Sequence, residues 1–264
     1  MAISFPEARQ IILNAALPLD VERVPLLEAA GRAAAEDITA PFSLPPLDNS
    51  AMDGYAVIAG SSVPEQPLRL KGFLPAGTVS QESVEPGTAI KIMTGAPLPP
   101  GADAVIPFEK CAEPDPQTVI LHNEVQAGDN IRHSGEDLRQ GDPAIAAGQF
   151  LRPAEINLLA ALRQATVPVR RRVRVAILAT GDELQEIDEL HFTGSVVNSN
   201  SWALAAAVRE IGGIPLLLGI ARDNHESLRQ KISEGLQADV LLTSAGVSTG
   251  DRDLVRDVLA ESGV

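Results

Sequence analysis

Three uninterrupted apolar segments in the last third of the chain constrain its fold most strongly. They are residues 173–179, 214–220 and 240–243. Between them lie two helical patterns, at 201–211, which Gly212 and Gly213 close, and at 225–236. Strands that are apolar on both faces and alternate with helices are typical of a parallel sheet covered on both sides. The pattern therefore predicts a three-layer α/β domain with a mainly parallel sheet.

The middle of the chain, from residue 41 to about 148, has a different pattern. Prolines and glycines recur every few residues, and the apolar runs between them are short. These runs are 55–58, 68–73, 89–93, 104–108 and 119–121. Regularly spaced short strands with turn signals between them predict a β-rich module. Helices are predicted on either side of it, one that Ser4 and Glu7 begin and one at 153–165.

The charge balance argues against a nucleic-acid partner. The chain has 21 Lys and Arg against 35 Asp and Glu, a formal net charge of -14. Such a chain is repelled by nucleic acid unless it carries a local basic stripe. The best candidate stripe is Arg170, Arg171, Arg172 and Arg174, for which the entry of a solvated strand is favoured over a phosphate-binding patch.

The remaining composition narrows the class of protein further. Cys111 is the single cysteine, so neither a disulfide framework nor a cysteine metal cluster is expected. The four histidines show no metal-ligand spacing. No apolar run reaches about 18 residues and no leader is visible, so we expect a cytoplasmic protein with no membrane partner.

Polar side chains follow all three predicted strands of the α/β domain. Asp182 and Glu183 follow the first, Asp223 the second, and Asp251 and Asp253 the third. Ligands of open α/β sheets bind outside the carboxyl ends of the strands. Loops of small residues that lead into a helix bind phosphate, and carboxylate oxygens suit Mg²⁺. The pattern predicts a site for a phosphate-bearing small molecule and a divalent cation. An alternative role is helix capping, by Asp223 or Asn224 after the second strand and by Asp251 and Asp253 after the third.

The β-rich region has polar clusters of its own. Asp53 lies in one, Thr94 ends a strand in another, and Arg132 and Asp137 share a third. Turn chemistry explains some of the neighbouring residues, but it does not explain why Asp53, Arg132 and Asp137 all lie in such polar loops. For Arg132 and Asp137 a structural salt bridge is an equally good interpretation.

Six runs of residues resemble the MoeA family of molybdopterin molybdenumtransferases, to which the E domain of gephyrin is related. They lie in the order of the family and cover nearly the whole chain. The runs are DNSAMDGYA (48–56), IMTGAPLPPGADAVIPFE (92–109), GDNIRHSGED (128–137), ATGDEL (179–184), VNSN (197–200) and TSAGVSTGDRD (243–253).

The resemblance implies an elongated, multidomain α/β plus β protomer. Residues 1–48 and 142–170 would form a small linking domain, 49–141 a β-rich arm, and 171–264 the molybdopterin-binding α/β domain. It also implies a cytoplasmic homodimer in which acids of the arm complete the active site of the other protomer. The family inserts molybdate into adenylylated molybdopterin in a reaction that needs Mg²⁺ and releases AMP. Molybdopterin adenylyltransferase and molybdoenzyme maturation proteins are further expected partners.

The family's functional residues carry over by motif. The implied catalytic residues are Asp53, Asp137, Glu183, Asp223 and Asp253. The implied substrate-binding residues are Thr94, Arg132, Ser199, Ser244, Gly246, Ser248 and Asp251. Of these acids, Asp223 and Asp251 are the implied Mg²⁺ ligands.

Two departures and two alternatives accompany the resemblance. Ala245 stands where the family usually has glycine, which requires a negative φ there. The family continues into further strands, a lysine-bearing segment and a C-terminal β domain, so we expect these 264 residues to end partway through the catalytic domain. The alternatives are a molybdopterin adenylyltransferase, which shares the TGDE and SGGVS-type loops but lacks the arm, and a non-catalytic pterin-binding or scaffold module.

Overall fold

The computed structural model describes residues 3–190, 193–244 and 254–263. Contacts divide the chain into two compact units. Unit 1 comprises Met1–Glu36, Ala147–Ala160 and Gln164–Val264, and unit 2 comprises Asp37–Ala146 and Ala161–Arg163. Each unit has its own sheet, and the boundaries of the three predicted parts stay a prediction.

The main sheet of unit 1 has three strands in the order β16-β13-β17. They are β13 (Arg174–Thr180), β16 (Ile214–Ala221) and β17 (Val240–Ser244). Both outer strands run parallel to β13, and Ala179 of β13 is in register with Ile220 and with Ser244. The carboxyl ends of all three strands therefore meet at one edge. The mixed α/β class is confirmed.

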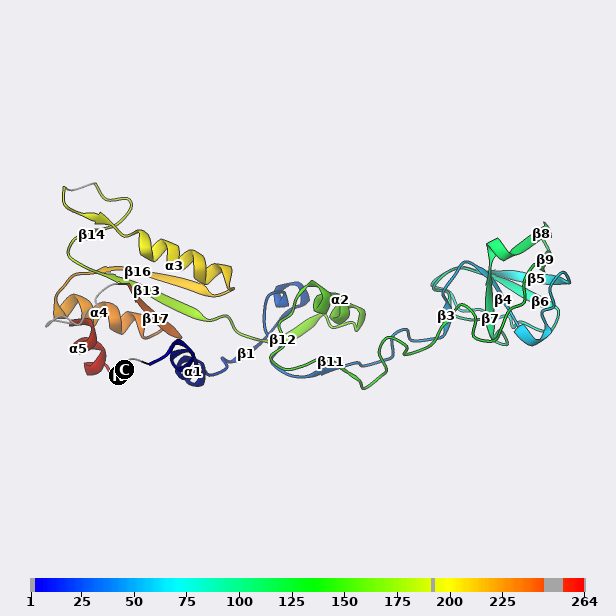
Figure 1. The fold of residues 1–264 in the computed structure, drawn as a ribbon, viewed down its shortest axis with the longest axis horizontal. Coiled ribbons are helices and arrows are strands. Elements are labelled where there is room, and N and C mark those ends of the chain that lie inside the picture. The colour runs from blue at the N-terminus through cyan, green and yellow to red at the C-terminus, as the bar shows by residue number, and fades with distance from the viewer. Residues whose placement is uncertain (1–2, 191–192, 245–253, 264) are drawn as a thin grey trace. The chain divides into compact units, whose positions relative to one another are not determined.

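Alternate side chains of β13 explain why helices cover both faces of this sheet. Val175 and Ile177 pack with α3 (Ser199–Glu210). Ala176 and Leu178 point the other way and pack with α4 (His225–Gly235) and α5 (Leu254–Glu261). Figure 1 shows α3 on one side of the strands and α4 with α5 on the other. A strand with both faces buried is continuously apolar, as the sequence pattern indicated.

Unit 1 also contains two further helices and several short strands. The structure confirms the predicted start of one helix and corrects the predicted end of the other. Helix α1 (Phe5–Ala15) begins as predicted, because Ser4 Oγ accepts from the Glu7 N–H and a Glu7 carboxylate oxygen accepts from the Ser4 N–H. Helix α2 (Pro153–Ala161) ends four residues earlier than predicted, before Arg163, which adopts a φ of 59°. The remaining strands are β1 (Val21–Pro25), β12 (Thr166–Arg170), β14 (Leu184–Gln185) and β15 (Val196–Val197), and a 3-10 helix spans Leu26–Ala29.

Unit 2 is built on a six-stranded sheet in the order β7-β4-β6-β5-β9-β8. Its strands are β4 (Gly54–Val57), β5 (Pro67–Leu74), β6 (Thr88–Ile92), β7 (Ala104–Pro107), β8 (Cys111–Asp115) and β9 (Thr118–Leu121). Apolar clusters lie on its opposite faces, one around Tyr55 and Ile106 and one around Ile90 and Val105. The five predicted strands are present, and β8 is an additional one.

Two short ribbons complete unit 2. In the first, β2 (Ile38–Thr39) pairs with β11 (Pro143–Ile145), and in the second β3 (Asn49–Ser50) pairs with β10 (Ile131–Arg132). Two short 3-10 helices, Ala59–Ser61 and Phe108–Lys110, lie among the strands of the large sheet. Among the described helices, none is both long and apolar enough to cross a membrane.

Candidate functional site

The loop that follows β13 carries two of the predicted acids. It begins at Gly181, whose N–H donates to the carbonyl of Ala221 at the end of β16 (3.1 Å). Gly181 has a φ of 145°, and a Cβ at this position would lie 2.5 Å from a carboxylate oxygen of Glu183. Only glycine suits this position. The loop 181–184 therefore holds the carboxylate of Glu183 against its own backbone at the carboxyl edge of the sheet.

The residues after β16 face the same loop. The Asp223 N–H donates to Oδ1 of Asp182 at 3.1 Å. Asn224 caps α4, since its Oδ1 accepts from the Ser227 N–H at 2.9 Å. Of the two residues for which capping was an alternative, Asn224 takes that role. The exposed carboxylate of Asp223 forms no hydrogen bond or ion pair with other described residues.

The third part of the sheet edge joins the start of α3 to the end of β17. Asn198 caps α3, and Asn200 in its first turn donates from Nδ2 to Ser244 Oγ at 3.4 Å. Ser199 is exposed in the same turn. The structure thus brings Ser199 and Ser244 to one edge. Asn200, the last residue of the VNSN run, also lies there, although the resemblance gave it no role.

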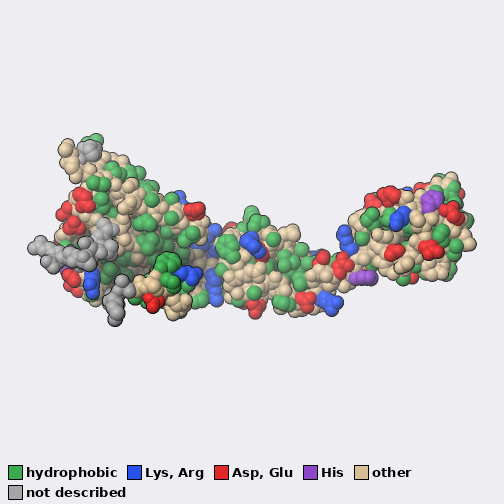
Figure 2. Space-filling model, viewed as in Figure 1, with side chains coloured by type: hydrophobic (Ala, Val, Ile, Leu, Met, Phe, Trp, Pro, Cys, Tyr) green, Lys and Arg blue, Asp and Glu red, His purple; other side chains and the backbone are tan. Residues whose placement is uncertain are grey.

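Four predicted residues, Gly246, Ser248, Asp251 and Asp253, lie outside the described residues. Among the described residues, no group of three or more His, Cys, Asp or Glu side chains could hold a metal ion. In Figure 2 acidic side chains gather on the visible face of the α/β part of the molecule.

Arg222 is a site residue to which the sequence pattern gave no role. Its Nη1 donates to the carbonyl oxygens of Leu184 (3.0 Å), Asp182 (3.1 Å) and Gly181 (3.5 Å). No sequence signal marks this contact, because backbone carbonyls carry no side-chain identity. Arg222 also lines a cavity of about 460 Å³ together with Asp182, Leu184, Gln185, Glu189, Leu190 and Ser195.

In unit 2 the structure brings Asp53 and Thr94 together. Asp53 Oδ1 accepts hydrogen bonds from the Thr94 hydroxyl at 2.6 Å and from the Thr94 N–H at 2.7 Å. These two donors hold the pKa of the Asp53 carboxyl below its ordinary value. The side chain is exposed, so an ionised carboxylate is presented to solvent at the base of β4.

Arg132 and Asp137, by contrast, are not joined by an ion pair within 4.0 Å among the described residues. Arg132 lies on β10 opposite Asn49, and the Asp137 N–H donates to the carbonyl of Leu44 at 3.1 Å. Both side chains are exposed. The salt-bridge interpretation is therefore not supported, and both charged groups remain accessible to a ligand or partner.

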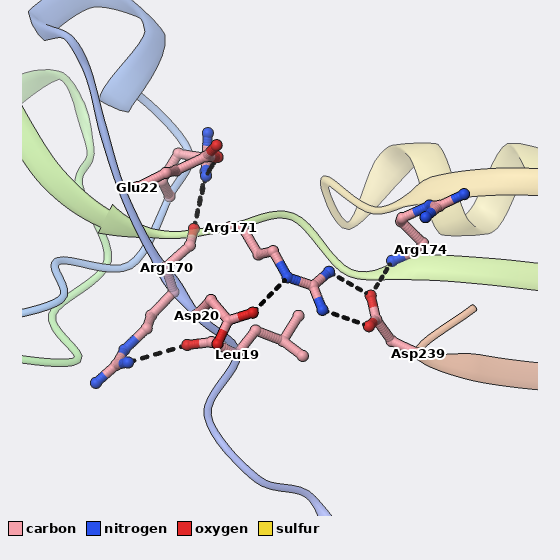
Figure 3. A network of polar contacts seen from close by, with 8 residues as sticks. Leu19, Asp20, Glu22, Arg170, Arg171, Arg174 and Asp239 are labelled. Atoms are coloured by element: carbon pink, nitrogen blue, oxygen red, sulfur yellow. Dashed lines mark hydrogen bonds and ion pairs between the residues drawn. The ribbon is translucent and has the colours of Figure 1, made fainter. Parts of the chain in front are cut away.

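The arginine run is largely engaged within unit 1 (Figure 3). Arg171 forms a two-pronged contact with Asp239, at 2.5 and 2.7 Å, and its Nε lies 3.6 Å from Asp20. Arg170 donates to the carbonyl of Leu19 at 2.9 Å. The Arg171 guanidinium, with the Arg174 N–H, lowers the pKa of Asp239 to about 2. These contacts favour the structural interpretation of the run.

Two family models match the chain. The first is described as the MoeA N-terminal region (domain I and II) and matches residues 3–162. The second is described as a probable molybdopterin binding domain and matches residues 176–264. The first alone covers more than half of the chain, and the second contains the sheet edge described above.

Several relatives with similar sequences carry the name molybdopterin molybdenumtransferase. The protein of that name from Nostoc sp. is 40% identical over 250 residues, which are 92% of this chain and 57% of the relative. The one from Synechococcus elongatus is 36% identical over 280 residues, 100% of this chain and 68% of the relative. The chain spans about 60% of the length of most of the curated relatives that it matches first.

A solved structure is also similar. The molybdopterin biosynthesis MoeA protein from Pyrococcus horikosii matches with a TM-score of 0.84 and 32% sequence identity. The match covers 99% of this chain and 67% of the Pyrococcus chain. The fold and the motifs of the sheet edge thus point to the same set of proteins.

Proposed function

Because the chain belongs to the MoeA family, we propose that it acts in molybdenum cofactor biosynthesis as a molybdopterin molybdenumtransferase or the greater part of one. The observation that carries this proposal is the sheet edge, where Glu183, Asp223 and Ser244 lie at the ends of three strands and Ser199 begins α3, within the region matched by the molybdopterin-binding model. The proposed substrates are adenylylated molybdopterin and molybdate, and the proposed products are AMP and the molybdenum-loaded pterin.

The chemistry of the edge suits a pterin nucleotide. Backbone N–H groups at the start of α3 and the hydroxyls of Ser199 and Ser244 can donate to phosphate oxygens. Release of AMP requires water to attack the phosphoanhydride, with its proton passing to a base. We assign Glu183, Asp223 and Asp253 to orienting that water and accepting its proton, and Gly246, Ser248 and Asp251 to binding the substrate.

Mg²⁺ is part of the proposal as the cation of this site. Asp223 is a proposed ligand because its carboxylate is exposed at the edge and has no partner among the described residues. Asp251 is the second proposed ligand. When bound, Mg²⁺ neutralises charge on phosphate oxygens. Titration of the protein–nucleotide complex with Mg²⁺ in a calorimeter, with wild type against Asp223→Asn, tests this assignment.

We further propose a homodimer in which Asp53, Thr94, Arg132 and Asp137 of one protomer complete the site of the other. Helix α1 supports it, because none of its residues is buried in the single chain. Phe5 and Ile12 are 81% and 68% exposed. Apolar side chains left uncovered on a helix indicate a partner surface. The proposed second copy would cover them.

Sedimentation equilibrium tests the dimer. Ile12→Asp should shift the protein toward the monomer, whereas Gln10→Asp on the same exposed helix should leave the mass unchanged. A wild-type protein that is monomeric at all concentrations would overturn this part of the proposal. Molybdopterin adenylyltransferase and molybdoenzyme maturation proteins are the further proposed partners, and the cytoplasm is the proposed location.

The central experiment measures binding and turnover separately. Calorimetry with adenylylated molybdopterin should show binding to the wild-type chain, and addition of molybdate and Mg²⁺ should release AMP. Asp223→Asn should impair both readouts. Asp188→Asn is the matched control, since Asp188 is an exposed acid that follows the same loop and makes no described contact. A wild-type chain that binds no pterin nucleotide would sink the proposal.

The same experiment separates the two alternatives. An adenylyltransferase would release pyrophosphate from ATP and molybdopterin, and unit 2, which matches the MoeA N-terminal region, argues against that activity. A non-catalytic scaffold would either bind no pterin nucleotide or bind it with an affinity that Asp223→Asn does not change.

A further inference from the structure

We infer that Arg222 is a positioning residue, which holds the loop 181–184 and with it the carboxylate of Glu183 at the sheet edge. The role of Arg222 in holding the loop rests on hydrogen-bond geometry, and its effect on pterin-nucleotide binding rests on the proposed function. Three carbonyl oxygens, those of Gly181, Asp182 and Leu184, converge on Nη1 of Arg222 at 3.0 to 3.5 Å. These are the residues on either side of Glu183.

The physical reason is the backbone of the loop. A tight turn directs carbonyl groups outward without partners from a strand or helix, and unpaired backbone groups are costly. Within this turn the Gly181 carbonyl accepts one long hydrogen bond, from the Leu184 N–H at 3.4 Å. A guanidinium remains charged at all accessible pH values, and hydrogen bonds from a charged donor are stronger than neutral ones. One arginine therefore satisfies a turn that no other described side chain contacts in this way.

The loop and the end of β16 are tied in both directions. The Gly181 N–H donates to the Ala221 carbonyl (3.1 Å), and the Asp223 N–H donates to the Asp182 carboxylate (3.1 Å). Arg222 lies between these two contacts in sequence. It therefore sets the separation between Glu183 on the loop and Asp223, the two described acids that we assign to the reaction.

The Arg222 guanidinium can donate to the loop carbonyls because it forms no ion pair with the described residues. Among the described residues, no carboxylate lies within 4.0 Å of its guanidinium. Its own N–H donates to Ser227 Oγ at 3.0 Å, which fixes its backbone to the first turn of α4. The guanidinium thus points at the loop carbonyls, and its positive charge lies beside the proposed site for the anionic pterin nucleotide.

Hydrogen–deuterium exchange and calorimetry on the full 264-residue chain test the inference with three variants. Arg222→Met removes the donor and keeps most of the side-chain length, and Arg222→Lys restores one charged nitrogen. Arg209→Met is the control, because Arg209 is an exposed arginine in the last turn of α3 whose side chain forms no hydrogen bond or ion pair with the described residues.

In Arg222→Met we expect the rate of amide exchange at Gly181, Leu184 and Asp223 to rise by about tenfold or more. This is the change expected from the loss of roughly one charged hydrogen bond. Exchange in β13 should not change. The affinity for adenylylated molybdopterin should fall by about tenfold. Arg222→Lys should recover part of both effects, and Arg209→Met should show neither.

The outcomes distinguish this inference from the proposed function. Unchanged exchange in the loop of Arg222→Met overturns the positioning role, whatever the ligand. If the wild type binds the pterin nucleotide and Arg222→Met shows faster loop exchange but the same affinity, the link between the loop and the site is overturned. If Arg222→Met shows faster loop exchange but the wild type binds no pterin nucleotide, the positioning role stands and the proposed function is refuted. If Arg222→Met does not fold, the same comparison is made with Arg222→Gln, which removes the charge and is too short to reach the three carbonyl oxygens, and unchanged loop exchange in that variant would refute the role.

Discussion

At the scale of single residues, Asp53 combines an exposed position with a fixed orientation. Its carboxylate accepts from both donors of Thr94, and its pKa is lowered, so it is ionised at neutral pH. An exposed side chain contributes little to stability. We therefore expect Asp53→Ala to lower molybdenum insertion by about a hundredfold. The melting temperature should change by less than about 4 °C.

Asp115→Ala is the matched control for this prediction. Asp115 is also an exposed acid of unit 2, and its Oδ1 accepts from the Gln117 N–H at 2.8 Å. It should keep its activity. A fall of many degrees in the melting temperature of Asp53→Ala would instead mean that Asp53 and Thr94 form a structural contact.

Asp239 supports a second prediction, about pH. Its pKa in the folded protein is about 2, below the ordinary 3.8, chiefly because Arg171 donates to it. A carboxyl whose folded pKa is depressed stabilises the protein above its unfolded pKa, and this contribution is lost as pH falls through the folded value. Asp239→Asn should lower the free energy of unfolding by about 1–2 kcal/mol at pH 7, and the difference should shrink between about pH 4 and pH 2.

Urea denaturation at a series of pH values measures this difference. Asp20→Asn is the comparison, because Asp20 lies 3.6 Å from Arg171 and its side chain is 90% exposed. It should have an effect near zero at every pH. A difference for Asp239→Asn that is the same at pH 7 and pH 2 would show that the charge of Asp239 is not what stabilises the fold.

At the scale of secondary-structure elements, the pair β4–β7 depends on one glycine. A Cβ at Gly54 would lie 2.0 Å from the carbonyl oxygen of Ile106 on β7, closer than side-chain atoms approach backbone. Gly54→Ala should destabilise unit 2 by about 3 kcal/mol, because the strands must separate. Gly72→Ala, in β5 of the same sheet, has open space around its Cβ and should be nearly neutral in a chemical denaturation series. Equal effects of the two variants would contradict this reason.

The sequence predicts these elements well where burial decides them. The apolar runs at 173–179, 214–220 and 240–243 became β13, β16 and β17, because a strand buried on both faces needs apolar residues at every position. Strand β8 was missed, since its residues are mostly exposed and include Glu113, Pro114 and Asp115. Helix α2 was predicted too long because the left-handed conformation of Arg163 leaves no trace in the apolar pattern.

The site was predictable to the extent that strand ends define it. Asp182, Glu183 and Asp223 follow strands and Ser244 ends one. Parallel pairing necessarily brings these strand ends to one edge. The contacts of Arg222 were not predictable. They depend on which way three carbonyl groups turn in a loop, and φ and ψ of a turn are set by tertiary packing as much as by residue type.

At the scale of the whole molecule, the net charge of -14 creates a difficulty for the proposed substrates, which are anions. The described sheet edge answers part of it. Arg222 leaves its positive charge without a carboxylate partner among the described residues, and the start of α3 presents N–H groups. Binding of an acidic protein to an anionic nucleotide should then weaken steeply when such local positive groups are removed, which is why Arg222 is tested by affinity as well as by exchange.

The division into two units leads to the last prediction, because each unit has its own apolar cores. The single tryptophan, Trp202, lies on α3 of unit 1, and the single tyrosine, Tyr55, is buried in unit 2. Chains with separate cores depart from two-state unfolding. In urea, the transition seen by Trp202 fluorescence should differ from the one seen by near-ultraviolet circular dichroism of Tyr55. Gly54→Ala should move only the Tyr55 transition to lower urea, whereas one coincident transition that moves as a whole would show that the chain unfolds as a single cooperative unit.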